Sequence, residues 1–263
     1  MNTTKRVASV QRIIVTGASR GIGRAVVERL AADGRSVHAV ARDETALAQL
    51  ASRGEGRITT TRLDLASRGG PREALASAIQ AMGAVDGLVS CAGIAPHRWV
   101  EEVDEEDIDA QVALNLRAPL LLARDLVAHL RARQAPGALV AVGSTLAMTP
   151  APGTSVYAAT KAGLTAALRT LALEVAAEGI RVNVVAPGII DTEMIRALRS
   201  LPGQPHPDAD EAQIQAQLAG FAALHPIGRL GRAEEVAEAA CFLLDATFAT
   251  GTVLVLDGGL TLR

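Results

Sequence analysis

Tyr157 is the single tyrosine of the sequence, and Lys161 stands four residues after it. Nearly all other positive charge is arginine, since only two of the 26 basic residues are lysines. Side chains four residues apart share one face of a helix, and the segment around this pair has helical character. An ammonium group stabilises a phenolate, so a phenol with an ordinary pKa of about 10 becomes easier to ionise beside one. The pair could therefore exchange protons near neutral pH, although a buried tyrosine beside an exposed lysine is the alternative.

Two further polar residues are candidates to act with this pair. Ser144 follows a segment expected to be a strand, and the thirteen residues from there to Tyr157 suffice for the chain to return to the same side of a sheet. Asn115 stands within a long helical pattern, where asparagine is a poor interior residue. We therefore expect Asn115 either to face solvent or to have a specific function.

A glycine cluster follows the first expected strand directly and opens a helix. Gly17, Gly21 and Gly23 have the spacing Gly-x-x-x-Gly-x-Gly. Glycine allows a tight turn and a close approach to a pyrophosphate, whose charge then lies at a helix N-terminus. The strand before the cluster and the helix after it favour a dinucleotide-binding site.

The end of the second expected strand bears on which dinucleotide binds. An acid at this point would bind the ribose 2′-hydroxyl of NAD, but the last strand residue is expected to be Ala41, and Arg42 follows it. Arg20, inside the glycine cluster, adds a second guanidinium, and two guanidiniums suit a 2′-phosphate. The sequence therefore favours NADP(H). NAD(H) is the alternative if Asp43 instead of Ala41 ends the strand, or if Arg42 is only a solvated residue at a helix start.

The elements that must position these residues alternate between strand and helix. Short segments rich in Val and Ile are expected to be strands buried on both faces, at 12–16, 36–41, 57–62, 87–90, 138–143, 181–186 and 252–256. Helical patterns lie between them, at 23–32, 44–52, 72–82, 105–132, 156–177 and 233–245. Such alternation implies right-handed parallel crossovers. The sequence therefore predicts an α/β fold of Rossmann type, a doubly wound, seven-stranded parallel sheet with helices on both faces.

We expect residues 1–263 to form a single Rossmann-fold domain, because no linker rich in Pro or Gly divides the chain. A polar, ragged N-terminus is expected over about 1–10. The segment 189–226 is unusually long and is expected to be a substrate loop or lid, with a surface insertion as the alternative. It carries Pro202, Gly203, Pro205 and Pro207.

Bulk composition argues against several classes of protein. A net charge of −2 at pH 7 argues against binding to nucleic acid or to an anionic membrane surface. No segment approaches ~18 uninterrupted apolar residues, so we expect no membrane-spanning helix. Two cysteines are too few for a disulfide framework and fit the reducing cytoplasm. The five histidines match no zinc spacing, so no metal is expected.

Taken together, these residues resemble the classical short-chain dehydrogenase/reductase family over about residues 10–259. The matching positions are 16–23, Asp64, Ala92, Gly93, Asn115, Ser144, Tyr157, Lys161, Pro187, Gly188 and 256–259. The resemblance implies that Tyr157 is the general acid in carbonyl reduction and the base in alcohol oxidation. It implies that Lys161 lowers the pKa of Tyr157 and binds the nicotinamide ribose. Ser144 would hydrogen-bond the substrate oxygen, and Asn115 would hold a water that links Lys161 to solvent.

The resemblance also implies a set of cofactor contacts. Ile190 and Thr192 would contact the nicotinamide amide, while Asp64 would bind the adenine amino group or cap the next segment. The expected cofactor-binding residues are Gly17, Ser19, Arg20, Gly21, Ile22, Gly23, Arg42, Asp64, Leu65, Ala92, Gly93, Tyr157, Lys161, Pro187, Gly188, Ile190 and Thr192. One position departs from the family, which usually has asparagine where this chain has Cys91. We expect a water or a neighbouring polar group to compensate, and an inert thiol.

The expected function is NADP(H)-dependent interconversion of a ketone, of 3-oxoacyl or other type, and a secondary alcohol by hydride transfer. An NAD-dependent secondary alcohol dehydrogenase is the alternative, and a non-catalytic nicotinamide-binding sensor a remote one. Trp99, Leu146 and Met194 are expected to contact a small-molecule substrate. The chain resembles 3-oxoacyl-(acyl-carrier-protein) reductase-like members most, but Glu178 places an acid where those often present a base, which weakens the carrier-protein interpretation. The resemblance also suggests a homotetramer that pairs the helices at 105–132 and 156–177.

Overall fold

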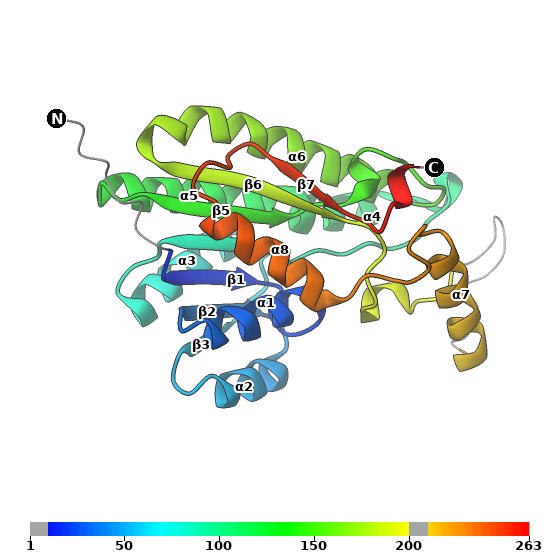
Figure 1. The fold of residues 1–263 in the computed structure, drawn as a ribbon, viewed down its shortest axis with the longest axis horizontal. Coiled ribbons are helices and arrows are strands. Elements are labelled where there is room, and N and C mark those ends of the chain that lie inside the picture. Colours follow the sequence, from blue (N-terminus) through cyan, green and yellow to red (C-terminus); the bar gives the residue numbers. More distant parts are fainter. Residues whose placement is uncertain (1–9, 200–209, 263) are drawn as a thin grey trace.

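The computed structural model describes residues 10–199 and 210–262. Seven parallel strands form one sheet in the order β3-β2-β1-β4-β5-β6-β7 (Figure 1). The strands are β1 Arg12–Thr16, β2 Ser36–Ala41, β3 Ile58–Arg62, β4 Gly87–Ser90, β5 Gly137–Val142, β6 Ile180–Pro187 and β7 Val253–Leu256. The strand order reverses between β1 and β4, which confirms the predicted doubly wound sheet.

The helices agree with the predicted ranges to within two residues at most ends, with two exceptions. The helices are α1 Gly21–Ala32, α2 Glu44–Arg53, α3 Gly70–Met82, α4 Glu105–Gln111, α5 Ala118–Ala132, α6 Ser155–Val175, α7 Glu211–Ala223 and α8 Ala233–Asp245. The single helix expected at 105–132 is divided by a π-helical segment, η2 Val112–Arg117, and α7 was not predicted. Short 3-10 segments are η1 Val100–Glu102, η3 Thr145–Ala147, η4 Ala176–Glu178, η5 Glu193–Ile195 and η6 Leu260–Leu262.

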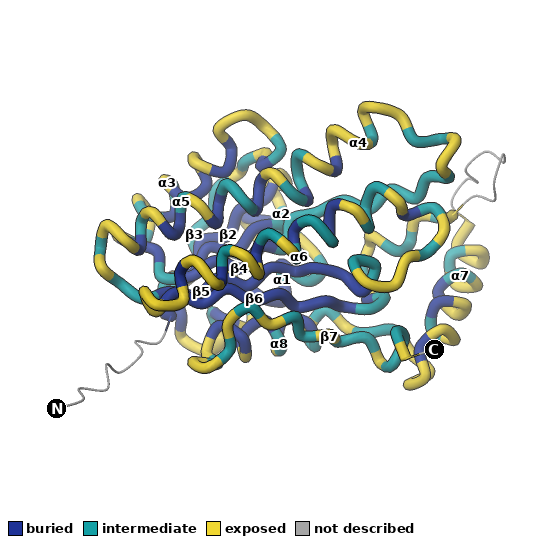
Figure 2. Tube along the Cα trace, turned by 90° about the horizontal axis from the view of Figure 1, so that it is seen from above, coloured by how far each residue is buried: buried dark blue, intermediate teal, exposed yellow. Residues whose placement is uncertain are grey.

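Each face of the sheet carries its own apolar core beneath a layer of helices. The helices α1, α2 and α8 cover one face, where the core includes Leu30 and Leu47. The helices α3, α5 and α6 cover the other, where it includes Leu126 and Leu168. Figure 2 shows the central strands buried between these layers. Burial on both faces explains why the strands are almost continuously apolar.

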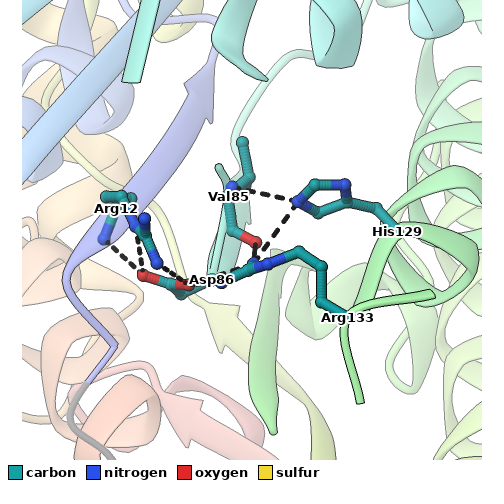
Figure 3. Close-up of polar contacts among 5 residues, drawn as sticks. All are labelled: Arg12, Val85, Asp86, His129 and Arg133. Carbon is teal, nitrogen blue, oxygen red and sulfur yellow. Dashed lines mark hydrogen bonds and ion pairs between the residues drawn. The ribbon is translucent and has the colours of Figure 1, made fainter. Parts of the chain in front are cut away.

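Asp86 joins β1, β4 and α5 at the N-terminal edge of the sheet (Figure 3). Arg12 donates to both carboxylate oxygens at 2.9 Å, and Arg133 donates to Oδ1 through both Nη atoms at 3.2 Å. Burial raises the pKa of Asp86, but the hydrogen bonds and charge of Arg12 outweigh it and hold that pKa below its ordinary value. His129 Nε2 accepts from the Val85 N–H at 3.2 Å beside them. This cluster holds β1, β4 and the end of α5 together at the N-terminal ends of the strands, opposite to their carboxyl ends.

The segment 189–226 has more secondary structure than the sequence indicated. It contains η5 and α7, and the helical pattern of α7 is weak because alanines stand on every side of the three larger apolar residues, Ile214, Leu218 and Phe221. The amide of Gln217 in α7 donates to the carbonyls of Ile195 and Ala197 at 3.0 Å each, and the Arg199 N–H donates back to Gln217 Oε1 at 3.0 Å. The first half of the segment is thereby tied to α7. Pro202, Gly203, Pro205 and Pro207 lie outside the described residues.

The expected ragged N-terminus also lies outside the described residues, apart from Val10. Val10 is buried in the core, where a Cβ at Gly87 would meet its side chain. Within 10–199 and 210–262, no helix has both the length and the apolar character needed to cross a membrane.

Candidate active site

The expected site residues gather at the carboxyl edge of the sheet. Gly17 follows β1, Gly93 follows β4, Ser144 follows β5 and Gly188 follows β6. Ligands of open α/β sheets bind outside this edge, where the strand order reverses. Here that point lies between β1 and β4, where the glycine loop and the segment after β4 meet.

Tyr157 and Lys161 lie in the first turns of α6. The Lys161 Nζ atom lies 5.6 Å from the centroid of the Tyr157 ring. Lys161 is only 4 % exposed, and Nζ donates to the carbonyl of Val142 at the end of β5 at 2.8 Å. The i, i+4 pairing expected from the sequence is therefore present, with the ammonium group anchored to the sheet.

Burial shifts both pKa values away from their ordinary positions. It lowers the pKa of Lys161 to about 8 and raises the pKa of Tyr157 to about 12, while a hydrogen bond with Ser144 offsets part of the latter shift. The net shift of the Tyr157 pKa is therefore upward, and the lowering by Lys161 that the resemblance implies stays a prediction. Desolvation of the phenol dominates, because the ammonium donates to a backbone carbonyl and lies over the ring.

Ser144 stands directly after β5 and begins η3. Its Oγ accepts from the Leu146 N–H at 3.1 Å, and its side chain lies close enough to Tyr157 to lower the pKa of the phenol. The serine hydroxyl and the phenol are thus brought together, as the spacing of Ser144 and Tyr157 led us to expect.

Asn115 is almost fully buried and joins two parts of the site. Its Nδ2 donates to the Ile94 carbonyl at 2.8 Å and to Thr160 Oγ1 at 3.3 Å, while its Oδ1 accepts from the Ile94 N–H at 2.9 Å. A Cβ built at Gly93 would lie 3.2 Å from Asn115 Oδ1 and 3.6 Å from Lys161 Nζ. Asn115 therefore braces the segment after β4 against α6 and does not face solvent.

The π-helical segment η2 that carries Asn115 has a cause in the sequence. Pro119 stands four residues after Asn115 and has no N–H, so the carbonyl of Asn115 cannot receive the usual α-helical hydrogen bond from that position. Within η2, the Ala118 N–H bonds to the Ala113 carbonyl, five residues back. Such insertions into α-helices are frequent at functional sites.

The glycine loop is packed too tightly for side chains. A Cβ at Gly17, whose φ is +66°, would lie 2.7 Å from the Ala92 nitrogen, and one at Gly23 would lie 2.2 Å from the Gly17 carbonyl oxygen. The N-cap residue of α1, Arg20, makes no side-chain capping bond, and the first turn contains no acid. The first N–H groups of α1 are thus directed at an anion site, which fits the pyrophosphate of a dinucleotide.

Thr16 compensates for the unusual Cys91. Its Oγ1 accepts from the N–H groups of Cys91 and Ala92 at 3.2 and 3.3 Å, which holds the segment after β4 against β1. A neighbouring polar group was one of the two adjustments expected. Burial raises the pKa of the Cys91 thiol to about 12, in agreement with an inert thiol.

β2 ends without an acidic residue. Ala41 is the last residue of β2, and the exposed Arg42 follows it. Asp43 is the N-cap of α2, where its Oδ1 accepts from the Ala46 N–H at 3.0 Å. Asp64 acts similarly after β3, since its Oδ1 accepts from the Ala66 N–H at 2.9 Å. The capping alternative considered for Asp64 is thus present.

Some of the other expected cofactor-binding residues could contact a cofactor only through backbone atoms. The side chains of Leu65 and Ile190 are buried in the protein. Thr192 packs against the glycine loop, since a Cβ at Gly21 would lie 3.2 Å from its Cγ2. The segment after β6 therefore borders the glycine loop, although the two are far apart in sequence. The remaining expected residues, Ser19, Ile22 and Pro187, lie in the glycine loop, in the first turn of α1 and at the end of β6.

The expected substrate residues are less closely grouped. Leu146 adjoins Ser144 in η3. The Trp99 ring packs edge-on against His97, with centroids 5.6 Å apart, and the His97 ring lies over Gly153 before α6. Met194 is half-exposed in η5. Sequence reasoning missed Thr160, which bonds Asn115, and Glu193, which bonds Arg20; the position of Thr160 beside Lys161 was the only available signal.

The fold and this site define a class: a dinucleotide-binding α/β protein with a tyrosine, lysine, serine and asparagine at the sheet edge. The family model for short chain dehydrogenases matches residues 11–202, and the chain belongs to that family. It is 36 % identical to 3-oxoacyl-(acyl-carrier-protein) reductase of Bos taurus, over 94 % of this chain and 97 % of that protein. It is 37 % identical to 3-oxoacyl-(acyl-carrier-protein) reductase FabG of Escherichia coli (strain K12), over 94 % and 96 %.

A solved structure has the same fold over almost the whole chain. The ligand-free aldohexose dehydrogenase of Thermoplasma acidophilum matches with a TM-score of 0.84 at 27 % identity, covering 97 % of this chain and 95 % of that one. Family membership and these relatives identify the protein as an NAD(P)-dependent oxidoreductase that interconverts ketones and alcohols.

Proposed function

We propose that the chain reduces a small-molecule ketone to a secondary alcohol with NADPH, with Tyr157 as the general acid. One observation carries the proposal: Tyr157 lies beside the buried Lys161, whose Nζ is 5.6 Å from the ring centroid, and close enough to Ser144 for that side chain to lower its pKa. A sensor that only binds nucleotide has no need of this arrangement.

The side chains act on the oxygen of the substrate. With a pKa of about 12, Tyr157 is protonated at neutral pH and can donate its proton to a ketone oxygen that is being reduced. Ser144 supplies a second donor, which stabilises the charge that develops on this oxygen. A bound nicotinamide would supply the hydride in reduction and accept it in oxidation. The raised pKa keeps Tyr157 in its protonated form at neutral pH, which is the form that donates a proton in ketone reduction.

Different groups of residues described above would bind different parts of the cofactor. The glycine loop and the first turn of α1 would hold the pyrophosphate. Lys161 would bind the nicotinamide ribose, and the backbone of Ile190 with the hydroxyl of Thr192 would bind the amide. Arg20 and Arg42 would bind the 2′-phosphate of NADP(H), a proposal supported by Ala41 at the end of β2 and by Asp43 as a helix cap.

The names of the relatives suggest that the substrate could be an acyl group bound to a carrier protein. In this chain Glu178 accepts hydrogen bonds from Arg131 Nε and Nη2 at 2.8 and 2.6 Å, so an acid neutralises a base beside the ends of α5 and α6. An acidic carrier associates best with a basic surface. We therefore propose a free ketone as substrate, with the segment 189–226 as its lid, and a 3-oxoacyl carrier-protein thioester as the second candidate.

A homotetramer is proposed as the working assembly. The proposal rests on the resemblance to the family, which suggests that the helices at 105–132 and 156–177 pair between subunits; Leu173 of α6, 85 % exposed, would lie in such an interface. Light scattering during gel filtration measures the mass directly. A species of about the monomer mass, 27.2 kDa, would contradict this proposal.

The test of function compares NADPH with NADH in ketone reduction by the wild type and by Tyr157→Phe. We expect turnover with NADPH, and a loss of about 10²- to 10⁴-fold in the variant, while NADPH still binds. Turnover in the variant equal to the wild type would refute Tyr157 as the acid. Faster alcohol oxidation with NAD would favour the secondary alcohol dehydrogenase instead.

A further inference from the structure

An acid from the segment after β6 reaches the glycine loop. Oε2 of Glu193 lies 2.6 Å from Nη1 of Arg20, an ion pair between residues 173 positions apart in the sequence. Both side chains are largely exposed, at 64 % and 68 %. The ion pair connects η5 to the N-cap residue of α1.

Backbone packing holds Glu193 in this position. Thr192, the preceding residue, contacts Gly21 so closely that a Cβ there would lie 3.2 Å from its Cγ2. On the other side, Gln217 binds the carbonyls of Ile195 and Ala197 and joins η5 to α7. The carboxylate is therefore a built-in neighbour of Arg20.

Arg20 is one of the two guanidiniums proposed for the 2′-phosphate, and it already has an anionic partner. A guanidinium binds phosphate best through two parallel N–H groups, whereas Nη1 of Arg20 donates to Glu193. The second guanidinium, Arg42, forms no ion pair within the described residues. A phosphate at this place would compete for Arg20 and would also be repelled by the carboxylate.

We propose that Glu193 tunes cofactor preference by competing with the 2′-phosphate for Arg20. This inference rests on the proposed NADP(H) function and deepens it. NADPH must displace Glu193 from Arg20, whereas NADH has no 2′-phosphate and leaves the ion pair intact. Glu193 thereby narrows the preference for NADPH that two arginines alone would produce.

Glu193→Gln tests the competition because it removes the charge and nearly preserves the size. Dissociation constants for NADPH and NADH are measured by titration calorimetry on the full-length protein. We expect the NADPH dissociation constant to fall about threefold to fivefold, as for an exposed ion pair, and the NADH constant to change less than about twofold. The effect should shrink as NaCl is raised, because salt screens exposed charges.

Two further variants isolate the ion pair. Glu28→Gln removes an acid of α1 that pairs with Arg24 at 3.0 Å, and it should leave the ratio of the two dissociation constants unchanged. In an Arg20→Ala background, the carboxylate of Glu193 can still repel the 2′-phosphate but no longer competes for Arg20. Glu193→Gln should therefore change the ratio of the two dissociation constants much less than it does in the wild type.

The outcomes separate this inference from the proposed function. The ratio of dissociation constants in the wild type tests the NADPH preference, while the change in that ratio caused by Glu193→Gln tests the competition. The inference is overturned if Glu193→Gln leaves the ratio unchanged, if it alters both nucleotides equally, or if its full effect persists without Arg20.

Discussion

Lys161 loses its positive charge at a lower pH than an ordinary lysine does. Burial lowers its pKa to about 8, so the ammonium is largely present at neutral pH and is lost above that value. Tyr157 remains protonated far beyond this point, because its pKa is about 12. We expect kcat/KM for ketone reduction to be level below about pH 8 and to fall above it, as measured by a pH–rate profile.

A comparison with Lys161→Arg checks the origin of this fall. Arginine stays charged at all these pH values, so the decline near pH 8 should vanish from the profile even if the overall rate is lower. A decline at the same pH in both proteins would assign it to another group.

His38 links the stability of the protein to pH. Its ring nitrogens contact Thr59 Oγ1 at 2.8 Å and Thr61 Oγ1 and Ser77 Oγ at 3.1 Å, and burial lowers its pKa to about 4. The unfolded chain, with a pKa near 6.5, binds a proton at this residue before the folded protein does. The stabilisation is complete above pH 6.5 and declines as the pH falls to about 4, by up to about 3 kcal/mol.

Urea denaturation between pH 4 and pH 8 measures this decline. In His38→Gln the free energy of unfolding should be lower at every pH but should lose the part of its pH dependence that lies above about pH 4. An unchanged pH dependence in the variant would contradict the assignment to His38.

At the scale of single residues, the sequence identified the catalytic candidates but not their electrostatics. Tyr157 and Lys161 were recognisable from spacing, because i, i+4 positions are fixed by helix geometry. Their pKa values depend on burial from elements far along the chain, and the pattern of neighbours in the sequence does not contain that information. The ion pair of Arg20 with Glu193 was unpredictable for the same reason.

The π-helical segment η2 is an element whose shape depends on one residue. Pro119→Ala would restore the N–H that can bond to the Asn115 carbonyl, and we expect η2 to shift toward a regular α-helix. The contacts of Asn115 with Ile94 and Thr160 would then be displaced. We expect kcat to fall by about tenfold, because small displacements in a site have large kinetic effects.

Circular dichroism and thermal unfolding provide the control for Pro119→Ala. The melting temperature should be unchanged or higher, since alanine favours helix. A variant with wild-type kcat would mean that the position of Asn115 does not depend on Pro119.

On the scale of the whole molecule, the sheet was predictable and its long segment after β6 was not. Strands buried on both faces produce apolar segments that are readable without a structure, and their alternation with helices restricts the order of the sheet. The helix α7 has only a weak signal, because alanines on its other faces dilute the helical spacing of Ile214, Leu218 and Phe221. Its position depends on Gln217 and on contacts with the rest of the protein.

Asp86 should affect stability without affecting chemistry, because it lies at the edge opposite to the candidate site. Asp86→Ala leaves the guanidiniums of Arg12 and Arg133 without their shared partner, and we expect a loss of about 2 kcal/mol in the free energy of unfolding. Asp33→Ala, which breaks the exposed pair with Arg29, should cost clearly less. Equal losses in urea denaturation, or a changed kcat in Asp86→Ala, would contradict this separation.

The two thiols of the chain, Cys241 buried and Cys91 half-buried, should react only slowly with alkylating reagents. Burial raises the pKa of Cys91 to about 12 and that of Cys241 to about 11, so thiolate is scarce at neutral pH. A fluorescent maleimide should therefore label neither at pH 7. One cysteine introduced on the exposed surface of α7 could then carry a single dye, which would report on the segment 189–226 during turnover without replacement of Cys91 or Cys241.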